Sequence, residues 1–411
     1  MIEVKGKYAK AIVYTDNIEP EAISQIIELC NQEFTTGAKI RIMPDCHVGS
    51  GCVIGFTGLL GEKVIPNIVG VDIGCGMLTV GLGKINITLE ELDNKIHDYI
   101  PAGFNVHEGR VMPFKALQNL HCYRDLKDTS RIERSIGTLG GGNHFIELSK
   151  DSNDNIYLII HTGSRNLGKQ VAEYYQKLAI ELCSGKDEFY DEKELLIYKF
   201  KKAGRKDEIQ KELKLLKEKY FHLSPKYPKD LCFLTDNYRE MYLHDMRICQ
   251  EFASLNRYKI AEKLIIWSTG DNLPLCNNSK YDYFETIHNY ISFADNIVRK
   301  GSISAYRDEK LLIPINMRDG SILGIGKGNS AWNYSAPHGA GRLMSRSKAK
   351  ENLTLEDYEN TMEGIFSTTI KQSTLDEAPM AYKSIEEIIN NIGDTVKIID
   401  ILKPIYNFKS S

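Results

Sequence analysis

The run Val71-Asp72-Ile73-Gly74-Cys75-Gly76-Met77 places a carboxylate and a thiol three positions apart among glycines. A tight turn with this spacing can direct both side chains at one ion, because glycine permits a close approach of the backbone. A sulfur ligand with nitrogen or oxygen partners suits Mn, Fe, Co or Zn better than Mg or Ca. A buried turn cysteine beside a capping aspartate would give the same sequence without a metal. The choice between these readings depends on whether other ligands exist.

Four further glycine-rich or turn-like runs carry histidines, at residues 140–147, 161–165, 287–290 and 335–342. Their imidazoles belong to His144, His161, His288 and His338. Each histidine alone is more often a hydrogen-bonded structural residue than a ligand. Together with Asp72 they predict a metal-dependent active site assembled from distant loops, because loops commonly carry such residues.

His338 lies in the sequence Pro337-His338-Gly339-Ala340-Gly341-Arg342. The proline and the small residues predict an exposed turn whose amides could hold a phosphate. Arg342 and Arg346 could add charge-assisted contacts to phosphate oxygens. A neutral imidazole in this setting could attack phosphorus and form a covalent adduct. A further metal ligand, or a turn without a catalytic role, are the alternatives for His338.

The composition limits the class of protein. The chain has 411 residues and 42% hydrophobic content, which is enough for a substantial core. The formal charge of −3 gives no global basic signature, so an RNA partner would need a local basic surface. Nine cysteines without a disulfide-type spacing, no signal peptide and no membrane-spanning run predict a reduced, cytoplasmic protein.

No repeat or low-complexity linker divides the chain, so we expect a single domain over residues 1–411. Periodicity predicts strands at residues 39–43, 64–71, 77–82, 156–161 and 311–317. It predicts helices at residues 21–33, 89–99, 170–183, 236–255 and 385–391. Mixed elements without strict alternation favour an α+β fold.

Residues 186–219 form a charged insertion with 11 Lys/Arg and 9 Asp/Glu. Apolar residues at helical spacing predict a helical hairpin, broken near Gly204, that packs one stripe on the body of the protein. A basic RNA-contacting arm is the alternative, and the balanced charge argues against it.

The five runs, preceded by Pro44-Asp45-Cys46-His47 and followed by Lys409, resemble the RtcB family of RNA-splicing ligases over nearly the whole chain. The resemblance implies the α+β fold of that family, with mixed sheets flooring a metal-containing catalytic cleft. It implies one guanylylated nucleophile, His338. It also implies a set of metal ligands: Asp72, Cys75, His144, His161 and His288.

Nucleotide contacts follow from the same resemblance: Asn143, His144, Phe145, Ile146, Glu147, His288, Asn289, Pro314, Ile315, Asn316, Met317, Ser321, His338, Gly339, Ala340, Gly341 and Lys409. Contacts to RNA or phosphate are expected from Arg165, Arg342 and Arg346. The chain departs from the family's usual P-G-S-M segment, which appears as Pro314-Ile315-Asn316-Met317, and from its terminal Lys-Gly, which appears as Lys409-Ser410-Ser411. These departures indicate a divergent branch, which could serve RNA repair instead of tRNA splicing.

The activity implied is a GTP- and Mn²⁺-dependent ligation with two bound ions, joining an RNA 3′-phosphate or 2′,3′-cyclic phosphate end to a 5′-hydroxyl end. The implied partners are RNA and an archease-type activator, and we expect a monomer. One rival is a metal-dependent phosphoesterase that uses the same ligands and an activated water, without a covalent intermediate. The other is an RNA-binding protein with a structural metal, although structural sites are usually closed by four ligands.

Overall fold

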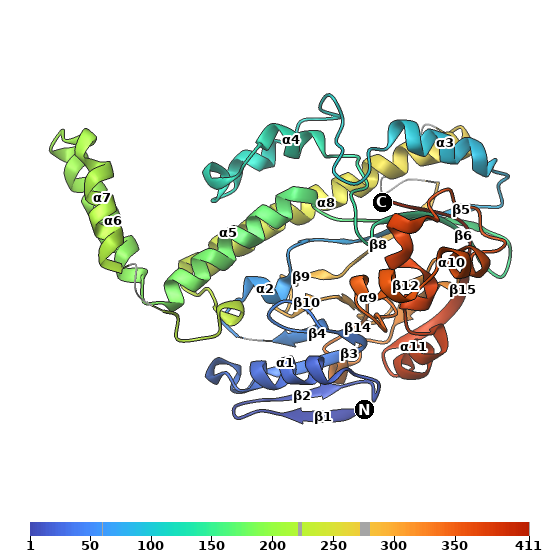
Figure 1. Ribbon diagram of the computed structural model, residues 1–411, viewed down its shortest axis with the longest axis horizontal. Coiled ribbons are helices and arrows are strands. Elements are labelled where there is room, and N and C mark those ends of the chain that lie inside the picture. Colours follow the sequence, from blue (N-terminus) through green and yellow to red (C-terminus); the bar gives the residue numbers. More distant parts are fainter. Residues whose placement is uncertain (60, 221–223, 272–279, 411) are drawn as a thin grey trace.

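A computed structural model describes residues 1–59, 61–220, 224–271 and 280–410. It confirms the α+β class: helices surround two large sheets and one small one (Figure 1). The cysteines were expected to be reduced, and the eight within the described residues are free thiols, while Cys276 lies outside them. Within the same residues, none of the helices has the length and apolar character that a bilayer crossing requires.

The six-stranded sheet lies toward the N-terminal side of the molecule and is mixed, since β2 and β3 are parallel and its other pairs antiparallel. In spatial order its strands are β1 (Ile2–Lys5), β2 (Lys10–Val13), β3 (Lys39–His47), β4 (Ile54–Leu59), β10 (Val298–Lys300) and β9 (Asn289–Ile291). A two-stranded sheet pairs β11 (Ser302–Ser304) with β14 (Ser335–Pro337).

The seven-stranded sheet is antiparallel throughout and nearly closes on itself. Its strands in spatial order are β12 (Lys310–Asn316), β13 (Gly320–Gly326), β15 (Val396–Lys409), β6 (Phe145–Lys150), β7 (Ile156–Thr162), β5 (Gly76–Gly83) and β8 (Asp282–Ile287). The long strand β15 pairs first with β13 and then with β6. The two outer strands approach each other where the Leu312 amide donates to Thr286 Oγ1 at 3.2 Å.

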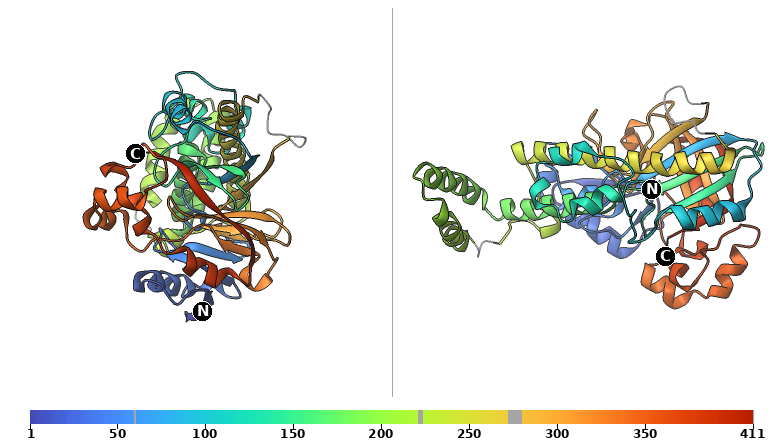
Figure 2. Two further views of the ribbon diagram at one scale, coloured as in Figure 1. Left: turned by 90° about the vertical axis from the view of Figure 1, so that its right-hand side faces the viewer. Right: turned by 90° about the horizontal axis from the view of Figure 1, so that it is seen from above.

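The helices pack around these sheets, and α5 and α8 run side by side along the body (Figures 1 and 2). Their bounds are α1 (Pro20–Cys30), α2 (Pro66–Val69), α3 (Leu89–Tyr99), α4 (Thr129–Arg134), α5 (Arg165–Cys183), α6 (Asp187–Lys202), α7 (Ile209–Tyr220), α8 (Asp236–Thr269), α9 (Arg346–Asn352), α10 (Leu355–Thr361) and α11 (Ile385–Ile392).

Most of the predicted elements are confirmed, but the strand expected at residues 64–71 is wrong. Only Val64 makes a bridge there, and α2 follows it. Pro66 explains the difference, because a proline lacks an amide hydrogen and its fixed φ suits the first position of a helix. Helix α5 also begins five residues earlier than predicted, and it includes Gly168, where a Cβ would lie 1.9 Å from Ser164 Oγ.

Residues 186–219 form the predicted helical hairpin, α6 and α7, which we call the arm. The break near Gly204 is confirmed, but the expected apolar stripe on the body is wrong. No residue of α6 is buried, and Tyr220 is the buried residue of α7. In Figures 1 and 2 the arm projects away from the sheets beyond the far end of α5. Some of its apolar residues contact the other helix, as Phe189 does with Tyr220, and Tyr190 at the base contacts Tyr238 of α8. Others, such as Leu195 and Tyr198, remain exposed.

Candidate active site

The candidate metal ligands lie at one end of four adjacent strands, β6, β7, β5 and β8. His144 immediately precedes β6, and its neighbour Phe145 pairs with His161 in β7. Cys75 immediately precedes β5, and His288 immediately follows β8. Because antiparallel strands in register bring these ends together, residues more than 200 positions apart become neighbours.

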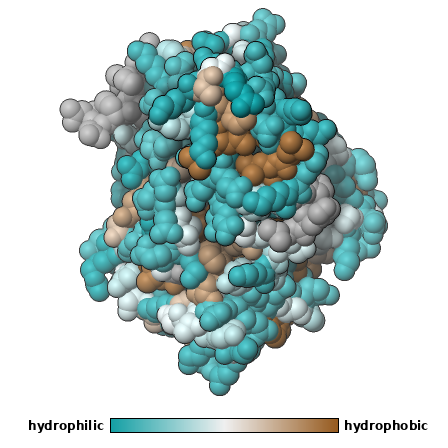
Figure 3. Space-filling model, turned by 90° about the vertical axis from the view of Figure 1, so that its left-hand side faces the viewer, coloured by the Kyte–Doolittle hydropathy of each residue, from teal (hydrophilic) through white to brown (hydrophobic). Residues whose placement is uncertain are grey.

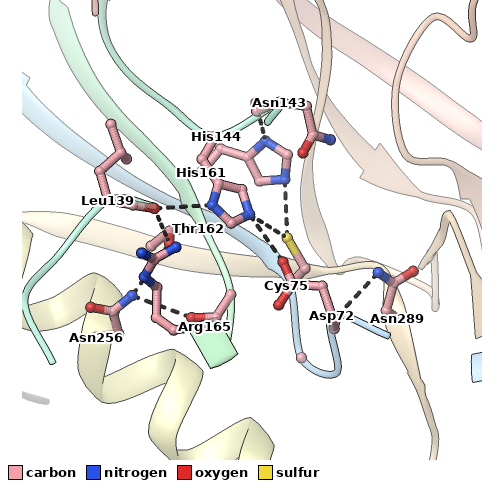
Figure 4. A network of polar contacts seen from close by, with 12 residues as sticks. Asp72, Cys75, Leu139, Asn143, His144, His161, Thr162, Arg165, Asn256 and Asn289 are labelled. Atoms are coloured by element: carbon pink, nitrogen blue, oxygen red, sulfur yellow. Dashed lines mark hydrogen bonds and ion pairs between the residues drawn. The ribbon is translucent and has the colours of Figure 1, made fainter. Parts of the chain in front are cut away.

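Two groups of donor atoms result, and they share Cys75. One group is Asp72, Cys75 and His144, and the other is Cys75, His161 and His288. Cys75 Sγ lies 3.5 Å from His144 Nε2 and 3.4 Å from His161 Nε2. His144 Nε2 lies 3.0 Å from Asp72 Oδ2 (Figure 4), and His161 Nε2 lies 3.0 Å from His288 Nε2. A set of sulfur, nitrogen and oxygen donors this close together would suit a transition-metal cation, and Cys75 is common to both groups.

Backbone carbonyls fix the orientation of two of these imidazoles. His144 Nδ1 lies 3.0 Å from Leu139 O, and His161 Nδ1 lies 3.2 Å from Asn143 O (Figure 4). A carbonyl oxygen can only accept a hydrogen bond, so each Nδ1 carries the proton and donates it. Each Nε2 therefore presents its lone pair toward the other candidate metal ligands. His288 presents Nε2 to the same place, while its buried Nδ1 has no hydrogen-bond partner among the described residues.

The electrostatics of the group favour a bound cation. Burial lowers the pKa of His161 and of His288 well below the usual range, so both rings are neutral donors. Burial, reinforced by Asp72, raises the pKa of the Cys75 thiol. Burial opposes ionisation of Asp72, but the neighbouring His144, Cys75 and His288 together outweigh it and lower the pKa of this carboxyl. A metal ion would stabilise the Cys75 thiolate that burial disfavours, so the donor set fits such an ion.

The turn that carries Asp72 and Cys75 depends on glycine and on β9. Gly74 has φ +73°, and a Cβ there would lie 3.0 Å from the Cα of Gln250 in α8. The Gly74 amide donates to Asn289 O at 2.8 Å, and Asn289 Nδ2 donates to Asp72 O at 3.2 Å. Asn289 was expected to contact a nucleotide, and in the structure its side chain holds this turn.

Helix α8 ties the ligand-bearing loops together through two fully buried polar residues, Asn256 and Arg257. Asn256 Oδ1 accepts from the amides of Gly137 and Thr138 at 2.7 and 3.0 Å. Its Nδ2 donates to Gly163 O at 3.2 Å, on the other loop. Arg257 Nη1 donates at 2.9 Å to carbonyls of both the Gly74 turn and β7. Neither residue stood out in the sequence, because polar residues in a long helix are usually exposed.

His338 lies against the second metal-donor group and is oriented by Asp45. Its ring centroid is 4.8 Å from that of His288. Asp45 Oδ2 lies 2.6 Å from His338 Nδ1 and also accepts from the His338 and Gly339 amides at 3.1 and 3.2 Å. Nδ1 therefore donates, and Nε2 keeps its lone pair. Gly341 permits the close packing here, because a Cβ at its φ of +78° would lie 2.3 Å from Asp45 O.

A cavity of about 270 Å³ opens beside His338. Many of the residues expected to contact the nucleotide line it: Asn143, Phe145, Glu147, Pro314, Ile315, Asn316, Met317, Gly339, Ala340, Gly341 and Lys409. Burial raises the pKa of Glu147 to about 7, although Ser149 and Asn407 donate to its two oxygens at 2.7 and 2.8 Å. Ser411 of the C-terminal motif lies outside the described residues.

His144 and His288, which belong to the two donor groups, do not line this cavity, and neither do three other residues with expected contacts. Ile146 points to the opposite face of β6, where it packs in the core. Ser321 is buried in β13, and its Oγ has no hydrogen-bond partner among the described residues. Arg165 lines a second cavity of about 630 Å³, together with Arg131 and Lys169.

Arg342 and Arg346 line the cavity near His338, but both are engaged by acidic residues that the sequence did not single out. Arg346 Nη1 lies 2.6 Å from Asp376 Oδ2 and also contacts Glu377. Arg342 Nη1 lies 3.6 Å from Glu377 Oε1. Burial opposes ionisation of Glu377, but the charges of Lys409 and Arg346 outweigh it and lower its pKa to about 2. The single sequence holds no signal for Asp376 or Glu377, whereas Asp45 lies in a motif that it displays.

Comparisons with known proteins all lead to one family. A family model described as "tRNA-splicing ligase RtcB" matches residues 25–124 and 115–410. The RNA-splicing ligase RtcB of Escherichia coli K12 is 29% identical, over 94% of this chain and 94% of that protein. The tRNA-splicing ligase RtcB of Nanoarchaeum equitans is 27% identical over 85% of this chain and 83% of its own.

The fold, the paired donor groups and the family match define an RNA ligase with a candidate metal centre. The chain belongs to the RtcB family. A second Escherichia coli relative, RNA-splicing ligase RtcB2 of strain ATCC 25922, is 24% identical over 96% of this chain and 93% of its own.

Proposed function

We propose that the chain is a GTP- and Mn²⁺-dependent ligase that joins RNA 3′-phosphate or 2′,3′-cyclic phosphate ends to 5′-hydroxyl ends. It would act in tRNA splicing or RNA repair, in the cytoplasm, as a monomer that an archease-type protein could activate. The observation that carries the proposal is the 2.6 Å contact of His338 Nδ1 with Asp45, beside two donor groups that share Cys75.

His338 is the proposed nucleophile. Because Nδ1 donates to Asp45, Nε2 can attack the α-phosphorus of GTP, forming an N–P bond while the bond to pyrophosphate breaks. The Asp45 carboxylate would stabilise the positive charge that develops on the ring. The RNA 3′-phosphate then takes GMP from His338, and the 5′-hydroxyl attacks that activated phosphate and releases GMP. A cyclic end would first be hydrolysed to a 3′-phosphate.

The two donor groups would each hold one Mn²⁺, which would supply charge stabilisation to the phosphate oxygens when bound. The candidate ligands are Asp72, Cys75, His144, His161 and His288. Their imidazoles, two of which are oriented by backbone carbonyls, and their single thiol support a transition metal over Mg²⁺ or Ca²⁺.

The cavity beside His338 is the proposed guanine nucleotide site. Glu147 at its wall can accept hydrogen bonds from guanine N1 and N2, whereas adenine presents an acceptor at N1. Lys409 lies close to Phe145 at the same wall. RNA phosphates would contact the second cavity, which Arg165, Arg131 and Lys169 line, and the guanidinium groups of Arg342 and Arg346 at the first cavity.

Incubation with α-labelled GTP and Mn²⁺, followed by denaturing electrophoresis, tests the proposal. The wild-type chain should retain label, His338→Ala should lose it, and the exposed control His121→Ala should keep it. Asp45→Asn should label more slowly, because the amide can donate to Nδ1 and favour the wrong tautomer. A wild-type chain that removes phosphate from RNA ends without ever carrying label would instead be the metal-dependent phosphoesterase.

A further inference from the structure

Few residues of the arm pack against the body of the protein, so the stability of the fold does not account for the presence of the arm. Residues 201–208 at its outer end are all exposed, and the two helices contact each other near its base, where Lys219 Nζ lies 2.9 Å from Glu192 Oε1. A projecting hairpin that buries so little on the body contributes little to the fold. Its sequence is therefore free to serve an external partner.

The charges of α6 and of the loop after it change sign along their length, although those of the whole arm nearly balance. Residues 186–194 at the base of α6 carry five acidic and two basic residues. Residues 195–208 at the outer end carry two acidic residues, Asp207 and Glu208, and five basic ones: Lys199, Lys201, Lys202, Arg205 and Lys206. The balanced total therefore hides a basic tip, which is the kind of local surface that binds phosphate.

One face of α6 combines these cations with exposed apolar groups. Leu195, Tyr198, Lys199 and Lys202 are spaced for one helical face, and all four are exposed. Tyr198 is 62% exposed, and Lys202 Nζ lies 5.9 Å from its ring centroid. Figure 3, viewed from the side of the arm, shows a mostly hydrophilic face with apolar patches. An aromatic ring flanked by lysines can stack on a base while the lysines bind phosphates.

The cations at the tip are also available for a partner. Among the described residues, Lys199, Lys201, Lys202 and Lys206 form no salt bridge, whereas Arg205 pairs with Glu208 and stacks over Phe200 at 4.8 Å. Exposed lysines of this kind retain flexible ammonium groups that follow a nucleic-acid backbone without reading its sequence.

We infer that the arm is an RNA-docking surface, whose basic tip binds the phosphate backbone of an RNA while the end of that RNA lies in the cleft. This inference rests on the RNA substrate of the proposed function. Helix α5 begins at Arg165, four residues after His161, and its 19 residues rise about 28 Å to the base of the arm. The 16 residues of α6 are about 24 Å long and turn away from the axis of α5 (Figure 1). A long or structured RNA would contact both the tip of the arm and the cavity beside His338, whereas a short strand bound at the cavity would not reach the arm.

The test measures binding by fluorescence anisotropy, without GTP or Mn²⁺, over a range of salt concentrations. It compares a structured RNA of about 70 nucleotides with a single strand of about 8 nucleotides, both with the same 3′-phosphate end. The tip variant is Lys199→Ala/Lys202→Ala/Lys206→Ala, which keeps good helix formers. The control, Lys7→Ala/Lys115→Ala/Lys397→Ala, removes the same charge from exposed positions on the body.

The tip variant should bind the long RNA on the order of tenfold more weakly, with a salt slope smaller by about three, and the loss should not depend on sequence. Its affinity for the short strand, and all properties of the control, should be unchanged. Equal losses for both RNAs, or no loss for either, would overturn the inference. A changed molecular mass in sedimentation with unchanged RNA binding would show a self-association surface instead. Because binding is measured without ligation, the inference can fail or hold independently of the proposed chemistry.

Discussion

The metal-donor groups and the arm are held in place by opposite means. The donor groups depend on buried hydrogen bonds from four strands, two loops and α8, so each ligand is fixed by contacts distant in sequence. The arm depends on two helices that contact mainly each other. Substitutions in the first region should therefore change stability and chemistry together, whereas substitutions in the second should change only the binding of a partner.

The largest expected effect is that of Cys75→Ala, because Cys75 belongs to both donor groups. Loss of this ligand should reduce ligation by about a thousandfold and lower the bound metal content, measured by elemental analysis. Cys46→Ala and Cys52→Ala remove equally buried thiols that belong to neither group, and should keep the metal. Normal metal content and turnover in Cys75→Ala would exclude a shared sulfur ligand.

Glu147→Ala should reduce labelling by GTP by about a hundredfold and leave metal binding nearly intact, since guanine would lose its acceptors. Because the pKa of Glu147 is raised to about 7, labelling by GTP should change with pH around that value. Below that pH the carboxyl is protonated and presents a donor to guanine N1–H, so wild-type labelling should fall as the pH drops from about 8 to about 6. Competition by unlabelled ATP as effective as that by GTP would exclude base recognition by Glu147.

Asn256→Ala should destabilise the fold, because it leaves the Gly137 and Thr138 amides without their acceptor in a buried place. The expected loss is on the order of 2 to 4 kcal/mol in the free energy of unfolding, measured by urea denaturation. Asn237→Ala, in the exposed first turn of the same helix, is the matched control and should have little effect. If both variants were equally stable, α8 would not be what holds the two loops together.

The smallest expected effect lies in the arm. Lys219→Ala removes the 2.9 Å ion pair with Glu192, whose side chains are both well exposed. Solvent screens such pairs, so the midpoint of urea denaturation should not change within error, and metal content should be that of the wild type. A clear loss of stability would mean that the arm is coupled to the body more tightly than its burial indicates.

The fold class and most helices and strands could be predicted, because hydrophobic periodicity and the positions of glycine residues are local properties of the sequence. The strand at residues 64–71 failed because its apolar run contains Pro66, whose preference for a helix start outweighed β propensity. The arm was predicted as a hairpin, but its place outside the body was not, since helical spacing cannot tell which surface an apolar stripe meets.

Candidate ligands could be named from the sequence because Asp72, Cys75 and the histidines lie in recognisable runs. Asn256 and Glu377 could not, since their importance comes from a fold that surrounds them with amides or cations. Ile146 shows the reverse: it belongs to a motif, yet strand alternation turns its side chain into the core.

The central place of β15 has a consequence for how the protein is made. This strand is the last element along the chain, yet it lies between β13 and β6 in the seven-stranded sheet. During synthesis from the N-terminus, β13 and β6 each keep an unpaired edge until residues 396–409 have emerged. Lys409 reaches the cavity beside His338 at the same moment. A nascent chain therefore carries its complete set of metal donors well before it can close the pocket that would use them.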